Sequence, residues 1–307
     1  MLAANFTGAI LAILAIPAHT MTPFELAEPR TLREAVALLD AGRASEGPVR
    51  AIAGGTALML MMKAGLYQPA RLVSLRRIEA QHAAISSTPE GGLRIGAMAT
   101  LSSLARSALV RQTAPVITQT LKTLSNVRVR NVATLGGHLA HGDPHMDLPP
   151  VLTVLGAHVR TLSPTGERTL AVADLYTGYY ETALAENELI AEVIVPAQSG
   201  RRATYLKITT RAADDWPTLG IAVSLHMQAD TVQDARIVVS AATNTPVRLL
   251  EVENTLRGAS LDKATLARCG DAAVAGVELA ADVHGSSAYK RELLRVYTQR
   301  ALRAALA

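Results

Sequence analysis

The stretch NVATLGGHLAHGDPHMDLPP, residues 131–150, contains two adjacent glycines, three histidines, two aspartates and three prolines. A segment with so many special residues has three possible interpretations. The histidines bind a metal ion, the glycines bind a phosphate group, or the whole segment forms an elaborate turn.

The metal interpretation depends on the spacing of His138, His141 and His145, whose i, i+3, i+7 offsets are those of ligands on one helix face. Pro144 disrupts this geometry, because proline pushes the residue before it out of the helical region. The letters GDP are also typical of a turn. The sequence therefore favours solvated or hydrogen-bonded loop histidines over a metal site.

The phosphate interpretation is supported by another glycine pair, Gly54 and Gly55, earlier in the chain. Like Gly136 and Gly137, this pair lies in the context of a strand followed by a turn. Paired glycines after a strand predict a tight turn whose successive N–H groups suit phosphate oxygens, and a ligand can approach without meeting a Cβ. Two such turns together could hold one pyrophosphate. Neither pair has the spacing of a Rossmann fingerprint, and no Walker motif occurs.

The composition excludes other classes of function. The chain of 307 residues is 49% apolar, which is typical of a globular protein of more than one domain. Its net charge of +4 is spread along the sequence without a basic block, so nucleic acid is not an expected partner. The single cysteine, Cys269, can form no internal disulfide and cannot hold an iron–sulfur cluster, so any cluster must lie on another chain.

Residues 1–20 form an extra apolar segment that ends just before a second methionine, Met21. The run resembles a signal peptide but has no Lys or Arg at its start, and its apolar part is too short to span a bilayer. We interpret it as an upstream start assigned by mistake, and we expect a cytoplasmic protein with no membrane span.

The remainder alternates helical and strand-like segments. Thr31 is predicted to cap a helix that Gly42 ends. A short apolar strand is expected from Val49 to the glycine pair at 54–55, and the run ARLVSLRRI, residues 70–78, is strand-like. Two strands are expected around SPTGE, residues 163–167, and another in ELIAEVIVP, residues 188–196. A polar connector near residue 200 predicts a domain boundary, after which a β-hairpin and three helical segments complete the chain.

Taken together, AGGTALMLMMKAG at residues 53–65 and RNVATLGGHLAHGDPHMDLPPVL at residues 130–152 resemble the two flavin segments of a known family. This is the FAD-binding medium subunit of molybdenum hydroxylases, a family that includes aerobic carbon monoxide dehydrogenase and xanthine dehydrogenase. Residues 207–225 are similar to the start of the family's C-terminal domain, and residues 286–302 to its closing helix.

The resemblance implies an α+β fold. A two-lobed FAD-binding domain of the vanillyl-alcohol-oxidase or MurB (PCMH) type is expected over residues 21–198, with lobes at about 21–76 and 77–198. A smaller α+β domain of the carbon monoxide dehydrogenase flavoprotein type is expected over residues 201–307. The implied FAD-binding residues are Ala53, Gly54, Gly55, Thr56, Ala57, Thr134, Leu135, Gly136, Gly137, His138, Asp147, Ile190 and Lys207.

The resemblance also implies roles for some of these residues. The two glycine segments would wrap the FAD pyrophosphate and ribityl chain. Asp147 would accept hydrogen bonds from cofactor hydroxyls, Ile190 would contact the flavin, and Lys207 would place positive charge near it. Ala57 and His138 depart from the family, which usually has a polar residue at the first position and Asn or Ser at the second. An altered site is therefore expected, with FAD weakened several-fold by the lost hydrogen bond at Ala57.

By the same resemblance, no catalytic acid or base is expected on this chain. Electrons would come from a molybdenum-cofactor large subunit through an iron–sulfur small subunit, and FAD would pass them to an external acceptor. The expected assembly is a hetero-oligomer, for example a dimer of heterotrimers. Two alternatives remain: a self-sufficient flavin oxidase of the same superfamily, with His138 or His141 available for a covalent flavin link, and a flavin-free subunit that only bridges its partners.

Overall fold

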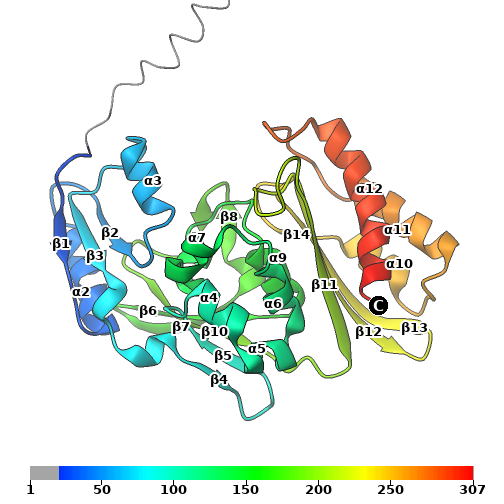
Figure 1. Cartoon of the computed structure of the whole chain (residues 1–307), viewed down its shortest axis with the longest axis horizontal. Helices are drawn as coiled ribbons and strands as arrows, with labels where there is room; N and C mark the ends of the chain where they lie inside the picture. The colour runs from blue at the N-terminus through cyan, green and yellow to red at the C-terminus, as the bar shows by residue number, and fades with distance from the viewer. Residues whose placement is uncertain (1–20, 307) are drawn as a thin grey trace, which may run out of the picture.

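The computed structural model describes residues 21–306, so the apolar segment 1–20 lies outside the described residues. Three sheet-based units follow one another from the blue N-terminal part to the red C-terminal part (Figure 1). In the described part of the chain, no helix is both long and apolar enough to cross a membrane.

The first unit is a small parallel sheet in the order β1-β3-β2, made of β1 (Glu25–Ala27), β2 (Val49–Ile52) and β3 (Arg71–Ser74). Helix α2 (Leu32–Gly42) packs on one face of it and buries Leu32, Ala35, Val36 and Leu39. Thr31 and Glu34 form a reciprocal capping box at the start of α2, as the sequence predicts for Thr31. The short helix α3 (Leu58–Lys63) follows β2.

The second unit is an antiparallel sheet in the order β4-β5-β10-β6-β7, with short helices packed against it. The strands predicted around SPTGE and in ELIAEVIVP are β6, β7 and β10. The bounds are β4 (Ile85–Ser87), β5 (Leu93–Gly96), β6 (His158–Ser163), β7 (Gly166–Ala171), β10 (Leu189–Val195), α4 (Leu101–Arg106), α5 (Ala108–Thr113), α6 (Pro115–Thr120), α7 (Val127–Val132), α8 (Leu135–Ala140) and α9 (Leu148–Val154), with a small hairpin of β8 (Tyr176–Gly178) and β9 (Glu181–Thr182).

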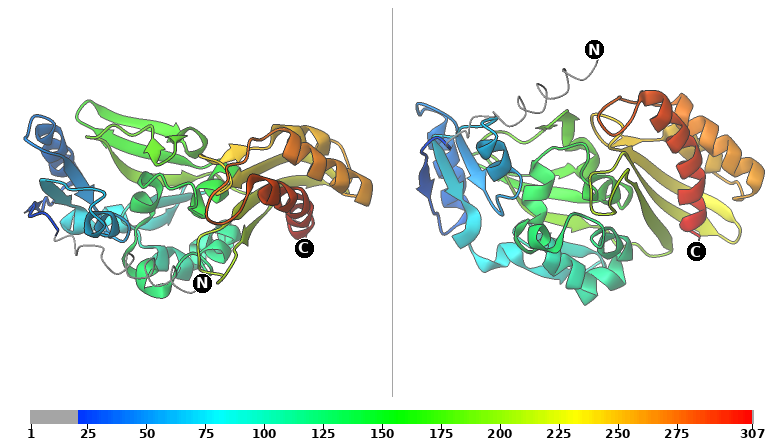
Figure 2. Two further views of the ribbon diagram at one scale, coloured as in Figure 1. Left: turned by 90° about the horizontal axis from the view of Figure 1, so that it is seen from above. Right: turned by 45° about the horizontal axis from the view of Figure 1, so that its top comes forward.

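The third unit is an antiparallel sheet in the order β11-β12-β13-β14, and the C-terminal helices cover its outer face (Figure 2). Its inner face packs on the second unit through α9, β12 and β13. The bounds are β11 (Arg201–Ile208), β12 (Leu219–Gln228), β13 (Thr231–Ser240), β14 (Val247–Arg248), α10 (Leu250–Leu256), α11 (Lys263–Ala275) and α12 (Ser287–Ala304).

The sequence-based expectation for this third unit is correct for the hairpin β12–β13 and for the three helices, and it misses β11. The letters AQSGRR suggested only a polar connector, yet β11 begins inside them at Arg201. Most side chains of β11 are half-buried, because β11 is the edge strand of its sheet and is contacted by α6 and α9 of the second unit and by α12 of its own. Such a strand has no clear alternation of apolar and polar residues, which is the signal that sequence reasoning uses.

Candidate functional site

The two glycine segments, far apart in the sequence, lie in direct contact. A Cβ placed on Gly54 would lie 2.1 Å from the carbonyl oxygen of Val132, and one on Gly137 would lie 3.6 Å from Cβ of Ala53. A heavy-atom separation of 2.1 Å is impossible without displacement of the backbone. Gly54 is therefore required so that the second segment can pack against the first, and not only for the approach of a ligand.

The first segment, residues 53–57, leaves the end of β2 and leads into α3. Gly55 has φ +70°, a left-handed conformation that favours glycine. The backbone amides of Gly54, Gly55, Thr56 and Ala57 donate no hydrogen bond to any residue in the region 21–306. Half-buried amides without a partner are uncommon, and a run of them around a left-handed residue is typical of an anion-binding nest. This loop thus fits the pyrophosphate of a dinucleotide.

The second segment differs from the expected glycine turn. Gly136 and Gly137 lie in the first turn of helix α8, which Thr134 caps by accepting a hydrogen bond from the Gly137 amide at 3.2 Å. The amides of Leu135 and Gly136 donate to the carbonyls of Ala99 and Ala97. The prediction of a second tight turn with free amides is therefore wrong.

Close packing explains the first glycine of this pair. A Cβ on Gly136 would lie 2.6 Å from Cβ of Ala97, so only glycine fits against residue 97. The amide of Ala97 in turn donates to the carbonyl of Ala191, which places Ile190 on β10 beside this segment. Gly137, in contrast, is exposed on the side that faces Ala53. The amides of Leu135, Gly136 and Gly137 in the second segment thus have partners within the fold, whereas those of residues 54–57 have none among the described residues.

His138 is 8% exposed, and its Nε2 has no hydrogen-bond partner among the described residues. Burial, with a smaller contribution from the charge of His141, lowers its pKa to about 3, so the imidazole is neutral at any working pH. A neutral imidazole that lacks a partner is ready to donate to or accept from a ligand. Ala57, the other departure from the family, precedes α3 and provides no side-chain cap.

Asp147 and Lys207 meet at the contact between α9 and β11. The carboxylate of Asp147 is 4% exposed and accepts hydrogen bonds from the Tyr205 hydroxyl at 2.8 Å and from Lys207 Nζ at 3.0 Å. Lys207 Nζ also donates to the carbonyl of Thr123. Burial raises the pKa of Asp147 despite the opposing effect of Lys207, so the desolvation cost exceeds the attraction of the pair. Their predicted roles toward FAD stay predictions, because both groups already have protein partners.

Sequence reasoning missed Arg50. On β2, Val49 and Ala51 pack into the core on the α2 side, so Arg50 points to the opposite face. Its charge helps burial to lower the pKa of His141, which lies just after α8. Arg50 is exposed and forms no ion pair with any described residue. A basic residue four positions before a glycine pair, within the short strand that leads to the pair, is the signal that could have identified it.

The three histidines do not form a metal site. His138 is buried, the His141 ring packs edge-on to Tyr180 at 5.2 Å, and His145 hydrogen bonds to Asp143 at 3.0 Å. No group of three or more His, Cys, Asp or Glu residues in the region 21–306 is arranged to hold a metal ion.

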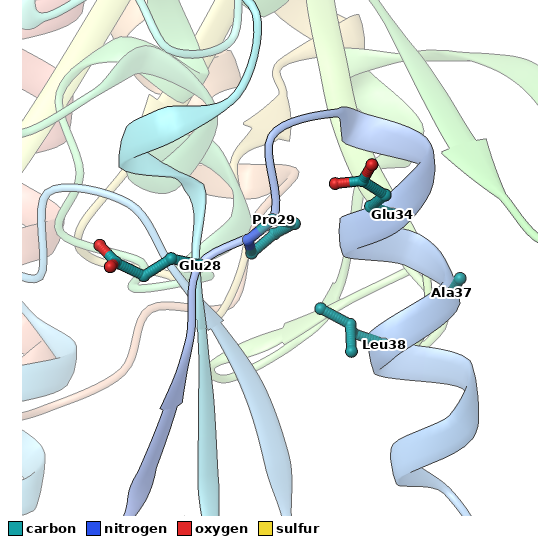
Figure 3. Close-up of a pocket in the computed structure, with 5 residues that line it drawn as sticks. All are labelled: Glu28, Pro29, Glu34, Ala37 and Leu38. Carbon is teal, nitrogen blue, oxygen red and sulfur yellow. The ribbon is translucent and has the colours of Figure 1, made fainter.

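A shallow hollow of about 420 Å³ lies elsewhere, at the end of β1 and the start of α2 (Figure 3). Glu28, Pro29, Glu34, Ala37 and Leu38 line it. Glu34 already accepts the amide hydrogen of Arg30 at 2.8 Å. The hollow is on the α2 side of the small sheet, opposite Arg50, so it is separate from the glycine segments.

Two family models match the chain. The FAD binding domain in molybdopterin dehydrogenase matches residues 22–198, and the CO dehydrogenase flavoprotein C-terminal domain matches residues 204–305. The chain belongs to the FAD-binding medium subunits of the molybdenum hydroxylases. FAD is the cofactor of this family, and its members are subunits of oxidoreductase complexes.

Among the relatives, the carbon monoxide dehydrogenase medium chain of Hydrogenophaga pseudoflava is 34% identical over 92% of this chain and 97% of its own. The nicotine 6-hydroxylase medium subunit of Paenarthrobacter nicotinovorans is 29% identical over 90% of this chain and 95% of its own.

The solved structure of the Hydrogenophaga pseudoflava carbon monoxide dehydrogenase aligns with a TM-score of 0.88 and 33% identity, over 94% of this chain and 98% of that one. The quinoline 2-oxidoreductase from Pseudomonas putida 86 aligns with a TM-score of 0.86 and 28% identity, over 94% of this chain and 98% of that one. The α+β fold expected from the sequence, an FAD-binding domain followed by a smaller domain, is thereby confirmed.

Proposed function

We propose that this subunit holds FAD where its two glycine segments meet, and that it carries electrons from the iron–sulfur clusters of a partner subunit to an external acceptor. When bound, FAD supplies the capacity to accept electrons singly or in pairs and to release them to an acceptor. The observation that carries the proposal is the contact between the two segments, with the free amides of residues 54–57 beside it.

The chain's own residues bind and orient the cofactor and perform no bond cleavage on a substrate. The amides of residues 54–57 and the guanidinium of Arg50 suit the pyrophosphate, because both are donors with positive character. His138 offers a neutral polar contact from the second segment. Cys269 is buried, and burial raises the pKa of its thiol to about 11, which fits a structural residue and not a nucleophile or a metal ligand.

The partners in this proposal are a molybdenum-cofactor large subunit and an iron–sulfur small subunit in a hetero-oligomer, such as a dimer of heterotrimers, within the cytoplasm. The relatives include a carbon monoxide dehydrogenase medium chain and a nicotine 6-hydroxylase medium subunit, so family membership alone does not define the substrate. That choice belongs to the large subunit.

The test is to co-purify the tagged chain with its partners and to follow the visible absorption of its flavin. We expect the chain alone to take up added FAD, and the flavin in the complex to be reduced once the iron–sulfur subunit has been reduced chemically. A chain that remains colourless with excess FAD would support the flavin-free bridging subunit. A flavin that stays oxidised in the reduced complex, but is reduced by a substrate added to the chain alone, would support the self-sufficient oxidase.

Arg50→Gln is expected to weaken FAD binding by about tenfold, the value of one lost charge-assisted hydrogen bond. The loss should shrink at high salt, since the exposed guanidinium acts through charge. Titration of the FAD-free protein, followed by flavin fluorescence at two salt concentrations, measures both effects. Arg33→Gln is the matched control, because Arg33 is an exposed arginine on α2, across the same small sheet. Equal affinities for the two variants would remove Arg50 from the site.

A further inference from the structure

His145 lies between two carboxylates that belong to different domains. Its Nδ1 is 3.0 Å from Oδ1 of Asp143, in the second glycine segment, and its Nε2 is 3.4 Å from Oδ2 of Asp282, which precedes α12. The side chains of His145 and Asp143 are 9% and 1% exposed. The imidazole is thus a buried link between the flavin-binding domain and the C-terminal domain.

Both carboxylates are held in place by other groups. Asp143 accepts a second hydrogen bond from the His145 amide at 2.9 Å and interacts with the Tyr180 hydroxyl. Asp282 accepts from Nζ of Lys290 at 2.7 Å and from the His284 amide at 2.8 Å. The Lys290 side chain is fully buried, which ties Asp282 firmly to α12.

Two more rings surround His145. Trp216, on the connection between β11 and β12, stacks on it with centroids 5.6 Å apart and an interplanar angle of 12°. The His284 ring lies at 5.6 Å, tilted by 56°. With only 9% of its side chain exposed, His145 has little contact with solvent, so the two carboxylates are its hydrogen-bond partners.

The protonation state of His145 decides whether both links exist. The imidazolium has two N–H donors, one for each carboxylate, whereas neutral imidazole has one donor and one lone pair. The single proton of the neutral ring stays with Asp143, because that contact is shorter. The Nε2 lone pair then faces the negative oxygen of Asp282, which repels it.

We propose that His145 is a pH-dependent clasp between the two domains, closed when the imidazole is protonated and open when it is neutral. The clasp joins the second glycine segment and the Trp216 connection to the start of α12. It therefore makes the packing around these segments sensitive to acidity, independently of whether FAD is bound.

The charges around His145 determine the direction of the effect. Burial lowers its pKa, but the hydrogen bonds and charges of Asp143 and Asp282 outweigh burial and raise the pKa above the ordinary value of 6.5. The other charged or titratable neighbours are Lys290, which donates to Asp282, Tyr180, which interacts with Asp143, and His284, whose ring lies 5.6 Å away. A raised pKa means that the clasp contributes its full stability below pH 6.5, and that this contribution is lost as pH rises through the folded-state value.

Hydrogen exchange of the full chain, corrected for the intrinsic effect of pH, tests the clasp. Between roughly pH 6 and roughly pH 9, the wild-type amides in 141–147 and 280–286 should become about tenfold less protected, as expected when one charge-assisted hydrogen bond is lost. His145→Gln should show the weak protection at both pH values. The control variant is His226→Gln, because His226 is a partly buried histidine on β12 outside the cluster. This variant should keep the wild-type response to pH.

Asp143→Asn provides an independent measurement if the glutamine variant folds poorly. The charge of Asp143 helps to raise the pKa of His145, so its loss should lower that pKa. The pH-dependent change in amide protection should then move to lower pH but persist. The proposal is overturned by a wild-type protein whose corrected protection does not depend on pH, by a His145→Gln variant that keeps the full pH response, or by an Asp143→Asn variant whose transition does not move.

Discussion

Gly137→Val is expected to yield a folded protein whose affinity for FAD is lower by roughly a hundredfold, equivalent to about 2.8 kcal/mol. Gly137 has helical geometry in α8 and an exposed backbone, so an L-residue is compatible with the fold. A new Cβ would meet only Thr134 Oγ1 at 3.0 Å and Cβ of Ala53 at 3.6 Å. The added methyl groups would occupy the space between the two glycine segments, where the cofactor is proposed to bind.

The measurement is the FAD dissociation constant from a fluorescence titration, with circular dichroism to verify folding. Gly276→Val is the matched control, because Gly276 follows α11 and an added Cβ would find no atom closer than 3.7 Å. Gly54→Ala gives a contrast: its Cβ would collide with the Val132 carbonyl, so it should lose both FAD and stability. A Gly137→Val protein that keeps wild-type affinity would place the cofactor away from the contact between the segments.

The sequence predicted which segments meet but not what each contributes. Gly–Gly pairs look alike in the sequence, yet Gly55 provides a left-handed turn whereas Gly136 provides close packing against Ala97. Whether the amides are free depends on residues 97–101, which pair with residues 133–136 across a long sequence separation. Local patterns carry no information on such pairing, so the expectation of a second amide nest was reasonable and wrong.

The lack of information on long-range contacts also explains why the positions of some side chains were not predicted. Arg50 was overlooked because alternation along four residues of β2 does not identify which face meets the second unit. Pro144 argued against three histidines on one helix face, and α8 does end at Ala140, but the sequence did not indicate that His145 lies beside another domain. In each case the composition of the segment was informative, and the missing knowledge was the position of a distant element.

Lys207→Met is expected to lower the free energy of unfolding by about 3–5 kcal/mol, because it leaves the buried carboxylate of Asp147 without its cation. For a chain of this size the melting temperature should fall by roughly 10 °C. Asp147→Asn should also destabilise the protein, since it leaves the ammonium group of Lys207, whose side chain is 7% exposed, with only the Thr123 carbonyl as a partner.

The double variant Asp147→Asn with Lys207→Met should recover most of this loss, because the asparagine still accepts from Tyr205 and no buried charge remains. Urea unfolding of the wild type, both single variants and the double variant gives the coupling free energy, which we expect to be at least about 2 kcal/mol. Additive losses would show that the two charges do not stabilise each other. FAD titration of the double variant then separates the two roles of the pair: recovered stability with weak FAD binding supports the predicted contacts to the cofactor, whereas recovery of both assigns the pair to the domain contact alone.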